Sequence, residues 1–347
     1  MKIVRWLFAL TLIAALAAGG FAFYQYRALD ARFAHDYADE YVQISQGSGA
    51  NRILGELEKK GIIREPLAAK LYLRYFDQGA LQAGDYRFAS PISAREVIAR
   101  LKDGKRRTTS LTIPEGWTRF EIAKRLAARF PTEPAVTEDD VLNMMNDVSL
   151  VADIDPEAKN LEGYLYPTTY EIELGASPDE VIARMVRQFK AIWKPEWEAA
   201  ARKLGKSRRE IMTIASLIEN ESKVDAERKL VSSVIYNRLR QGIPLGIDAT
   251  NVYIAKLLGR WDGIIHKSDV EVDHPYNTRK VYGLPPGPIS SASVSAIEAA
   301  LHPAETDFLY YVLNVEKGDG SHHFYATAAG FSQGKRAYQQ WLAKQRN

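Results

Sequence analysis

Ile214-Ala-Ser-Leu-Ile-Glu-Asn-Glu-Ser222 is the stretch from which the organisation of this chain can be worked out. It places two acidic residues, Glu219 and Glu221, at the end of a short and strongly apolar run. A carboxyl group at the edge of an apolar helix face loses hydration, and this desolvation raises its pKa. A carboxylic acid that keeps its proton near neutral pH can act as a general acid. The alternative is that both side chains only cover the solvated side of a helix.

The residues around this stretch predict one amphipathic helix. Ser207-Arg-Arg-Glu210 has the pattern of a capping box, which begins a helix. At about 100° per residue, one apolar face is then formed by Ile211, Ile214, Ala215 and Ile218. Glu221 flanks this face on one side and Glu219 on the other. Residues two apart on a helix do not face each other, so we expect no acid–base pair, and periodicity favours Glu221 only slightly.

The composition excludes several classes of protein and site. Charged residues make up 26% of the 347 residues and apolar residues 46%, which is typical of a globular protein with a hydrophobic core. A net charge of +3 is too small to indicate a nucleic-acid partner. The chain has no cysteine, which excludes disulfides, thiol nucleophiles and cysteine metal sites. This absence also suits an oxidising compartment.

The N-terminal segment predicts a membrane anchor. Lys2 and Arg5 precede an uncharged, apolar run from Trp6 to Tyr24, which is long enough to cross a bilayer as a helix. The basic residues favour an N-terminus in the cytoplasm, with the rest of the chain outside. A cleaved signal peptide is the alternative, because Ala15-Leu-Ala17 resembles a cleavage site. The run continues into an aromatic flank, which favours a retained anchor.

We expect an α+β chain in four parts. These are residues 1–27, a cytoplasmic tail and transmembrane helix; 28–39, a polar connector that continues helically; 40–107, a small α/β module; and 108–347, a helix-rich domain with a short β-sheet. The module's patterns predict strand, helix, helix, strand, helix, with a solvated basic boundary at Asp103-Gly-Lys-Arg-Arg107. This order resembles LysM-type glycan-binding modules. A packing domain that holds the rest of the chain off the membrane is an equal alternative.

The C-terminal part carries further local signals, which place helices, a loop and a hairpin. They are a helix from about Ala226 to Gln241 ended by Gly242, an irregular segment over Leu161–Tyr170, a loop rich in proline and glycine over Tyr276–Ile289, strands over Phe308–Val315 and His323–Ala326 around Gly318-Asp-Gly320, and a final amphipathic helix from Ser332.

Several motifs together resemble one known family. In chain order they are Leu161-Glu-Gly-Tyr-Leu-Tyr-Pro167, Ile214 to Ser222 as quoted above, Ala226-Glu-Arg228, Val234-Ile-Tyr-Asn-Arg-Leu239, Ile247-Asp-Ala-Thr250, Tyr276-Asn-Thr278 and Gly283-Leu-Pro-Pro-Gly-Pro-Ile-Ser290. In these residues the chain resembles the endolytic murein transglycosylase (YceG-like) family over essentially its whole length, including the anchor and the LysM-like module. Ala249 departs from the pattern, since many relatives carry proline there, and this concerns loop rigidity but no catalytic group.

The resemblance implies a catalytic acid and a reaction. The second Glu of the Glu-x-Glu pair is the acid of the family, which here is Glu221. The implied reaction cuts nascent glycan strands internally, between N-acetylmuramic acid (MurNAc) and N-acetylglucosamine (GlcNAc), and leaves 1,6-anhydro-MurNAc ends. Hydrolysing glycosidases usually need two carboxyls. Here the sugar's own 6-hydroxyl attacks, and the high effective molarity of an intramolecular reaction reduces the need for a second one.

The same motifs supply residues expected to bind the glycan. They are Ser222, Asn237, Asp248, Thr250, Tyr276, Asn277 and Thr278. Asp248 and Thr250 have a structural alternative as the N-cap of a helix, which we expect for Thr250 more than for Asp248. Residues 276–278 lie on a loop, where function concentrates. Glu162 is expected to orient Tyr164 or Tyr166 and to transfer no proton.

No cofactor or metal is expected, since His322 and His323 are adjacent on a predicted strand and no His-Glu-x-x-His pattern exists. The expected partners are peptidoglycan glycan strands, the bacterial inner membrane through one N-terminal helix and, as the resemblance implies, nearby peptidoglycan synthases. Nucleic acid is not expected. Two alternatives stay open. A hydrolytic muramidase would need Asp248 as a second carboxylate across the cleft, and a non-catalytic peptidoglycan-binding scaffold would also explain the anchor and module.

Overall fold

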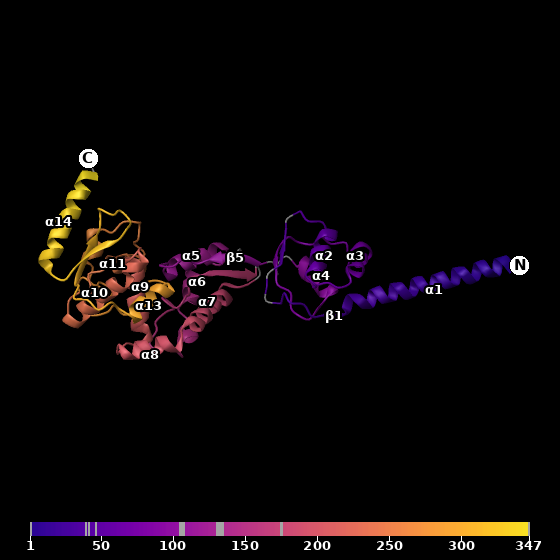
Figure 1. Ribbon diagram of the computed structural model, residues 1–347, viewed down its shortest axis with the longest axis horizontal. Helices are drawn as coiled ribbons and strands as arrows, with labels where there is room; N and C mark the ends of the chain where they lie inside the picture. Colours follow the sequence, from indigo (N-terminus) through magenta and orange to yellow (C-terminus); the bar gives the residue numbers. More distant parts are fainter. Residues whose placement is uncertain are drawn as a thin grey trace. The chain divides into compact units, whose positions relative to one another are not determined.

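Figure 1 shows the computed structural model of the chain, which describes residues 2–38, 40, 42–45, 47–103, 108–129, 135–173 and 176–345. Two compact units are present. Unit 1 comprises Met1–Leu111 and Glu171–Ala176, and unit 2 comprises Thr112–Tyr170 and Ser177–Asn347. Residues 171–173 and 176 thus belong to unit 1 although they are distant from the rest of it in sequence, which no local pattern indicated.

Unit 1 contains the long N-terminal helix and a small α/β fold. Its elements are α1 (Lys2–Asp30), β1 (Arg32–Phe33), β2 (Val42–Ile44), α2 (Ala50–Lys59), α3 (Pro66–Tyr75), β3 (Gly84–Tyr86), β4 (Ile92–Ser93), α4 (Ala94–Lys102) and the start of β5 (Thr108–Thr112). The predicted order of strand, helix, helix, strand, helix is confirmed by β2, α2, α3, β3 and α4. Most of the predicted basic boundary, residues 104–107, lies outside the described residues.

The connector after the first helix differs from the sequence prediction. We expected the helix to continue through the connector, but α1 ends at Asp30 and the chain turns into β1. This strand pairs antiparallel with β4, with Phe33 opposite Ile92. The amide of His35 also donates to Ser90 Oγ over 2.9 Å. Long-range pairing therefore overrides the polar, helix-like composition of this segment.

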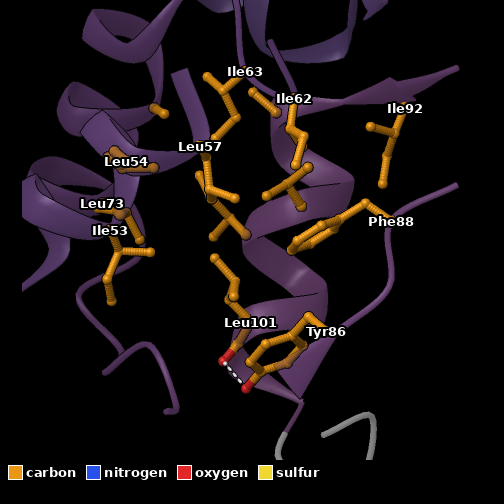
Figure 2. Packing of buried hydrophobic residues seen from close by; sticks show 14 of the residues in the cluster. Ile53, Leu54, Leu57, Ile62, Ile63, Leu73, Tyr86, Phe88, Ile92 and Leu101 are labelled. Carbon is orange, nitrogen blue, oxygen red and sulfur yellow. Dashed lines mark hydrogen bonds between the residues drawn. The ribbon is translucent and has the colours of Figure 1, made fainter. Parts of the chain in front are cut away.

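Unit 1 has a hydrophobic core of its own (Figure 2). From α2, Ile53, Leu54 and Leu57 are at most 1% exposed, which is the spacing of one helix face. Tyr86 of β3 and Leu101 of α4 belong to the same cluster, and the Tyr86 hydroxyl donates to the Leu101 carbonyl over 3.4 Å. Burying an aliphatic side chain of this size contributes about 1.5–3 kcal/mol. The core therefore gives this unit a source of stability that does not depend on unit 2.

Unit 2 is rich in helices and carries a short hairpin, so the α+β prediction is confirmed. Its elements are α5 (Arg119–Arg129), α6 (Glu138–Met144), η2 (Val148–Val151), α7 (Pro178–Ile192), α8 (Pro195–Lys203), α9 (Arg208–Glu221), η3 (Asp225–Glu227), α10 (Arg228–Gln241), α11 (Asp248–Leu257), α12 (Lys267–Glu271), α13 (Val294–Leu301), β7 (Tyr310–Leu313), β8 (His322–Tyr325) and α14 (Ala328–Gln345). Strand β6 (Thr169–Glu173), whose last three residues belong to unit 1, follows β2, β3 and β5 in a four-stranded sheet. Within unit 2, β7 and β8 pair antiparallel.

Helix α9 is the central element of unit 2. It begins with the predicted capping box, in which the Glu210 amide donates to Ser207 Oγ over 3.2 Å and the Ser207 amide to Glu210 Oε2 over 2.8 Å. Every residue from Ile211 to Ile218 is buried, so the helix is covered on all sides and not only along the predicted stripe. The reason is that α8, α10, α11 and α13 all pack against it. The acidic pair therefore follows a rigid, enclosed helix.

Candidate active site

Glu221 is the last residue of α9 and lines a pocket of about 500 Å³. The opposite walls come from the β7–β8 hairpin, including Leu313 and His322, and from Trp341 of α14. The side chain is half-buried, so its carboxyl borders the pocket without being surrounded by bulk water. A carboxyl placed at the wall of a hollow can reach a bound molecule, which a carboxyl enclosed in the core cannot.

The surroundings of Glu221 favour its protonated form. Burial raises the pKa of this carboxyl, and the negative charge of Asp248 raises it further. The C-terminal end of a helix, where the macrodipole is negative, acts in the same direction. A hydrogen bond from Tyr311 and the charges of His322 and Arg238 lower the pKa, but the net shift is upward. This is the state that a general acid needs.

Tyr311 on β7 contacts the Glu221 carboxyl directly. Its hydroxyl donates to Glu221 Oε2 over 2.5 Å, and burial raises the pKa of Tyr311, so this hydroxyl keeps its proton. The Tyr311 ring meets the His322 ring edge to face at 5.3 Å. His322 is fixed in turn by Glu227, because its amide donates to Glu227 Oε1 over 2.9 Å and its Nδ1 lies 3.0 Å from Oε2. The hairpin is thereby tied to the segment that follows the acid.

Sequence reasoning did not identify Tyr311, His322 or Glu227 as members of the site. Tyr311 is 90 positions from Glu221 and His322 is 95 from Glu227, so no local spacing connects them. The only signals were that Glu227 belongs to a quoted motif and that the hairpin was predicted. Among the described residues, no group of three or more His, Cys, Asp or Glu is placed to hold a metal ion.

Glu219 has a different environment from Glu221, as their spacing predicted. Its Oε2 accepts hydrogen bonds from Arg228 Nη1 and the Ser293 amide, both over 2.9 Å, and its Oε1 accepts one from Arg228 Nη2 over 3.1 Å. The two charged side chains are 7% and 10% exposed. Glu219 is therefore a buried structural anion that joins α9, α10 and α13, which the periodicity did not reveal.

Asp248 is a predicted glycan-binding residue whose negative charge raises the pKa of Glu221. It is the first residue of α11, and Arg279 Nε donates to its Oδ1 over 2.9 Å. The capping role expected for Thr250 is wrong. The N-cap residue is Ile247, and Thr250 Oγ1 donates to its carbonyl over 2.7 Å, so this hydroxyl satisfies an acceptor and no helix amide.

Asn277 and Thr278 fix the loop that carries Arg279. Both are fully buried. Asn277 Nδ2 donates to the carbonyls of Val270 and Val272 over 3.0 and 2.7 Å, and Thr278 Oγ1 accepts from the Ile247 amide over 2.9 Å. Their polar atoms are thus used inside the protein, where they set the position of the start of α11. The neighbouring Tyr276 is half-buried and packs its ring on that of Tyr253, with 5.0 Å between centroids.

Asn237 and Ser222 are also directed inward. Asn237 Nδ2 donates to the carbonyls of Thr306 and Phe308, both over 2.9 Å, just before β7. Ser222 Oγ donates to the Val224 carbonyl over 2.9 Å. Asn237 therefore fastens α10 to the segment that leads to Tyr311. Of the predicted site residues, Asp248 therefore acts on Glu221, together with Tyr311 and His322, which the sequence did not indicate.

The glycine- and proline-rich loop packs tightly on the irregular segment at residues 161–170. Gly163 has a φ of +81°, and a Cβ added there would lie 2.5 Å from the Cβ and Cγ atoms of Pro288. The next loop residue, Ile289, donates its amide to Ser216 Oγ over 3.0 Å. Two of the quoted motifs therefore meet on α9, and glycine at 163 is required both by backbone conformation and by space.

Glu162 does not orient Tyr164 as expected, because the Tyr164 hydroxyl donates to Asp155 Oδ2 over 2.6 Å. Instead, both carboxyl oxygens of Glu162 accept from the Arg119 amide over 3.1 Å, at the start of α5. Burial raises the pKa of Glu162 to about 7, against the effect of this hydrogen bond. Its partner was missed because it lies 43 positions away.

Comparisons with known proteins agree with the motifs. A model of the YceG-like family matches residues 42–337. The endolytic murein transglycosylase of Bacillus subtilis (strain 168) is 31% identical over 313 residues, which cover 86% of this chain and 84% of that protein. The protein of the same name from Streptococcus pneumoniae serotype 2 is 30% identical over 336 residues, covering 89% of this chain and 61% of that protein. A crystal structure of a YceG-like protein from Listeria monocytogenes, 33% identical, gives a TM-score of 0.59 over 84% of this chain and 97% of that one.

Proposed function

Since the chain belongs to the YceG-like family, we propose that it is an endolytic lytic transglycosylase of peptidoglycan. It cleaves nascent glycan strands between MurNAc and GlcNAc and leaves 1,6-anhydro-MurNAc ends. The observation that carries the proposal is Glu221, a half-buried carboxyl at a pocket wall whose pKa is raised by burial and whose Oε2 accepts the Tyr311 hydroxyl.

The reaction can be written with Glu221 as the one proton carrier. Its carboxyl donates a proton to the glycosidic oxygen as the bond from that oxygen to C1 of MurNAc breaks. The carboxylate formed is stabilised by the hydrogen bond from Tyr311. The 6-hydroxyl of the same MurNAc then bonds to C1 and gives its proton to the carboxylate, so Glu221 ends in its starting state. Water is not consumed, and the product ring closes within one sugar.

Asp248 supports the positive charge that develops on the sugar. It is 55% exposed in its side chain and pairs with Arg279, so it stays available at the site without being enclosed. The same position favours a second candidate, a hydrolytic muramidase, in which Asp248 would direct water or act as a nucleophile. The two reactions differ in product mass, because an anhydro end is one water lighter than a reducing end.

The other predicted glycan-binding residues divide by burial. Tyr276, which is half-buried on a loop, is retained as a sugar contact together with Asp248. For the buried ones we propose a positioning role, through the internal hydrogen bonds described above: Ser222, Asn237, Thr250, Asn277 and Thr278. Asn237, Thr250 and Thr278 hold α11 and the segment before β7, the elements that present Asp248 and Tyr311, while Ser222 fixes the segment that follows Glu221.

The proposed location is the bacterial inner membrane. The segment Trp6–Asp30 of α1 is long and apolar enough to cross a membrane, a property that a signal sequence shares. We propose that residues 1–27 are a retained anchor, 28–39 a connector, 40–107 a LysM-like module and 108–347 the catalytic domain outside the cytoplasm. This location keeps the enzyme near newly made glycan and near peptidoglycan synthases.

Digestion of purified peptidoglycan by the detergent-solubilised protein tests the proposal. Wild type should release fragments with anhydro ends, and Glu221→Gln should release none, because the amide has no proton to donate; general acid–base groups contribute about 10²–10⁴-fold. The matched control is Glu316→Gln, which changes an exposed carboxyl in the turn between β7 and β8 and should cleave normally. Cleavage by a folded Glu221→Gln protein would contradict the assignment, and reducing ends would favour the muramidase.

A further inference from the structure

Exposed apolar side chains in unit 1 gather on one short helix. Outside α1, the large hydrophobic residues of the described part of unit 1 that are exposed to solvent are Leu67, Tyr75 and Phe76, at 45%, 64% and 78%. The first two belong to α3 and the third follows it directly. A cluster of this kind on a folded unit marks a surface that contacts something other than water.

The sequence of α3 gives this cluster a regular pattern. At positions i, i+3, i+4, i+7 and i+8, which share one helix face, stand Leu67, Lys70, Leu71, Arg74 and Tyr75. None of the five is acidic. The opposite face packs into the core of unit 1 through Ala68, Ala69 and Leu73, the last of which is labelled in Figure 2. Leucine and tyrosine beside lysine and arginine is the composition of a helix that lies in the headgroup layer of a bilayer.

The way α1 enters unit 1 brings this layer close to the folded unit. The uncharged run from Trp6 to Tyr24, at about 1.5 Å per residue, nearly spans the ~30 Å hydrocarbon core. The next turn of the same helix is already part of the fold, since Gln25, Ala28 and Leu29 are at most 9% exposed. With α1 as the membrane anchor of the proposed function, unit 1 therefore begins within about one helical turn of the bilayer boundary.

Contacts connect α3 to this end of α1. The Tyr24 hydroxyl donates to Oε1 of Glu65, the residue before α3, over 3.3 Å. Arg95 lies over the rings of Tyr26 and Tyr72, at 5.5 and 4.8 Å from the centroids. Positions 24 and 26 are only about 3 Å apart along α1, so both contacts fall within one turn of α1, at the end of its uncharged run. Figure 1 shows α3 on the side of unit 1 from which α1 emerges.

We propose that α3 is a second membrane contact, an interfacial helix that lies on the outer face of the bilayer. Leu67, Leu71, Tyr75 and Phe76 enter the layer between headgroups and acyl chains, while the two basic side chains pair with anionic phospholipid. The inference rests on the anchoring of α1 that the proposed function includes. Its consequence is that unit 1 is held flat against the membrane at two points, which limits how far it can tilt away.

The absence of cysteine from the chain makes a direct test possible. Three single-cysteine variants of the full-length protein are made, Tyr75→Cys in α3, Phe21→Cys in α1 and Arg52→Cys in α2. Each cysteine is labelled with an environment-sensitive fluorophore. Arg52 is an exposed residue of α2, with 70% of its side chain accessible. Each protein is reconstituted in vesicles of phosphatidylcholine with phosphatidylglycerol. Quenching by iodide in the water is compared with quenching by a lipid that carries a nitroxide near its headgroup.

We expect the label at 75 to be quenched by the nitroxide lipid and protected several-fold from iodide relative to the label at 52. Adding Lys70→Glu and Arg74→Glu should reduce that protection in vesicles with phosphatidylglycerol. If iodide reaches 75 as readily as 52 while 21 remains in lipid, the anchor holds and the interfacial helix is refuted. If iodide also reaches 21, the anchor itself is wrong and the inference fails with it.

Discussion

Tyr311→Phe isolates the contribution of one hydroxyl to the acid. In the wild type this hydroxyl donates to Glu221 Oε2 over 2.5 Å, and it opposes the rise that burial causes in the pKa of that carboxyl. Hydrogen bonds to charged groups contribute about 1.5–3 kcal/mol. In the proposed reaction the Glu221 carboxylate forms as the glycosidic bond breaks, so removing the hydrogen bond from Tyr311 should slow cleavage about 10- to 100-fold.

The variant should also change the pH dependence of cleavage in a defined direction. The proton donor is the uncharged carboxyl, so activity falls as pH rises through the pKa of Glu221. Without the hydroxyl that pKa moves higher, and the alkaline limb of the profile should move to higher pH. The charged and polar groups that act on Glu221, namely Asp248, His322 and Arg238, stay in place.

The assay is the rate of fragment release from peptidoglycan across a pH series, with thermal unfolding as the test of folding. Tyr310→Phe is the matched control, because Tyr310 is the neighbouring residue on the same strand. Its ring stacks on that of Phe331, with 5.1 Å between the centroids. It should leave rate and profile unchanged. A folded Tyr311→Phe protein with wild-type rate and pH profile would refute the role given to this hydroxyl.

Three further predictions concern stability. Glu219→Gln breaks the buried ion pair with Arg228 of α10 and should lower the free energy of unfolding, measured by urea denaturation, by about 3–5 kcal/mol. The folded molecules should still cleave peptidoglycan. Unchanged stability would contradict the structural role of Glu219. Folding raises the pKa of Glu162 from 4.5 to about 7, so its stabilising contribution is complete below pH 4.5 and is lost as pH rises to about 7. The wild-type free energy of unfolding should therefore fall by on the order of 3 kcal/mol across this range, and Glu162→Gln should remove that slope. Gly163→Ala adds a methyl group against Pro288 at a positive φ and should lower the free energy of unfolding by at least about 1–3 kcal/mol. Gly205→Ala is the control, because Gly205 has a φ of +65° but no atom within 4 Å of an added Cβ, and it should lower the stability less. Equal melting temperatures for the two variants would argue against the clash with Pro288.

Local signals in the sequence predicted the elements that carry the site. Ser207 and Glu210 lie three positions apart and form their capping box within one turn, so the start of α9 could be read from the sequence alone. Gly242 ends α10 in the left-handed conformation, with φ 65°, for which glycine has no steric cost. The hairpin at β7 and β8 followed from turn residues that act over a few positions.

The remainder depends on contacts between distant segments. No pattern within the chain links Tyr311 with Glu221, and none indicates that Glu219 has Arg228 and Ser293 as partners. The connector was mispredicted for the same reason, since β1 exists only because β4 lies beside it. The motifs indicated which residues lie near the site, but not which of their polar atoms form hydrogen bonds inside the protein.

Glu221 precedes Tyr311 in the chain, and this order has a consequence for biogenesis. A ribosome that has finished Glu221 must still add 90 residues before its hydroxyl partner exists. A copy whose synthesis or export stops early, or one clipped before the hairpin, therefore has an incomplete centre. Such a copy lacks the hydroxyl that donates to Glu221 Oε2, so we expect it to cleave more slowly than the full-length protein, as the Tyr311→Phe variant should.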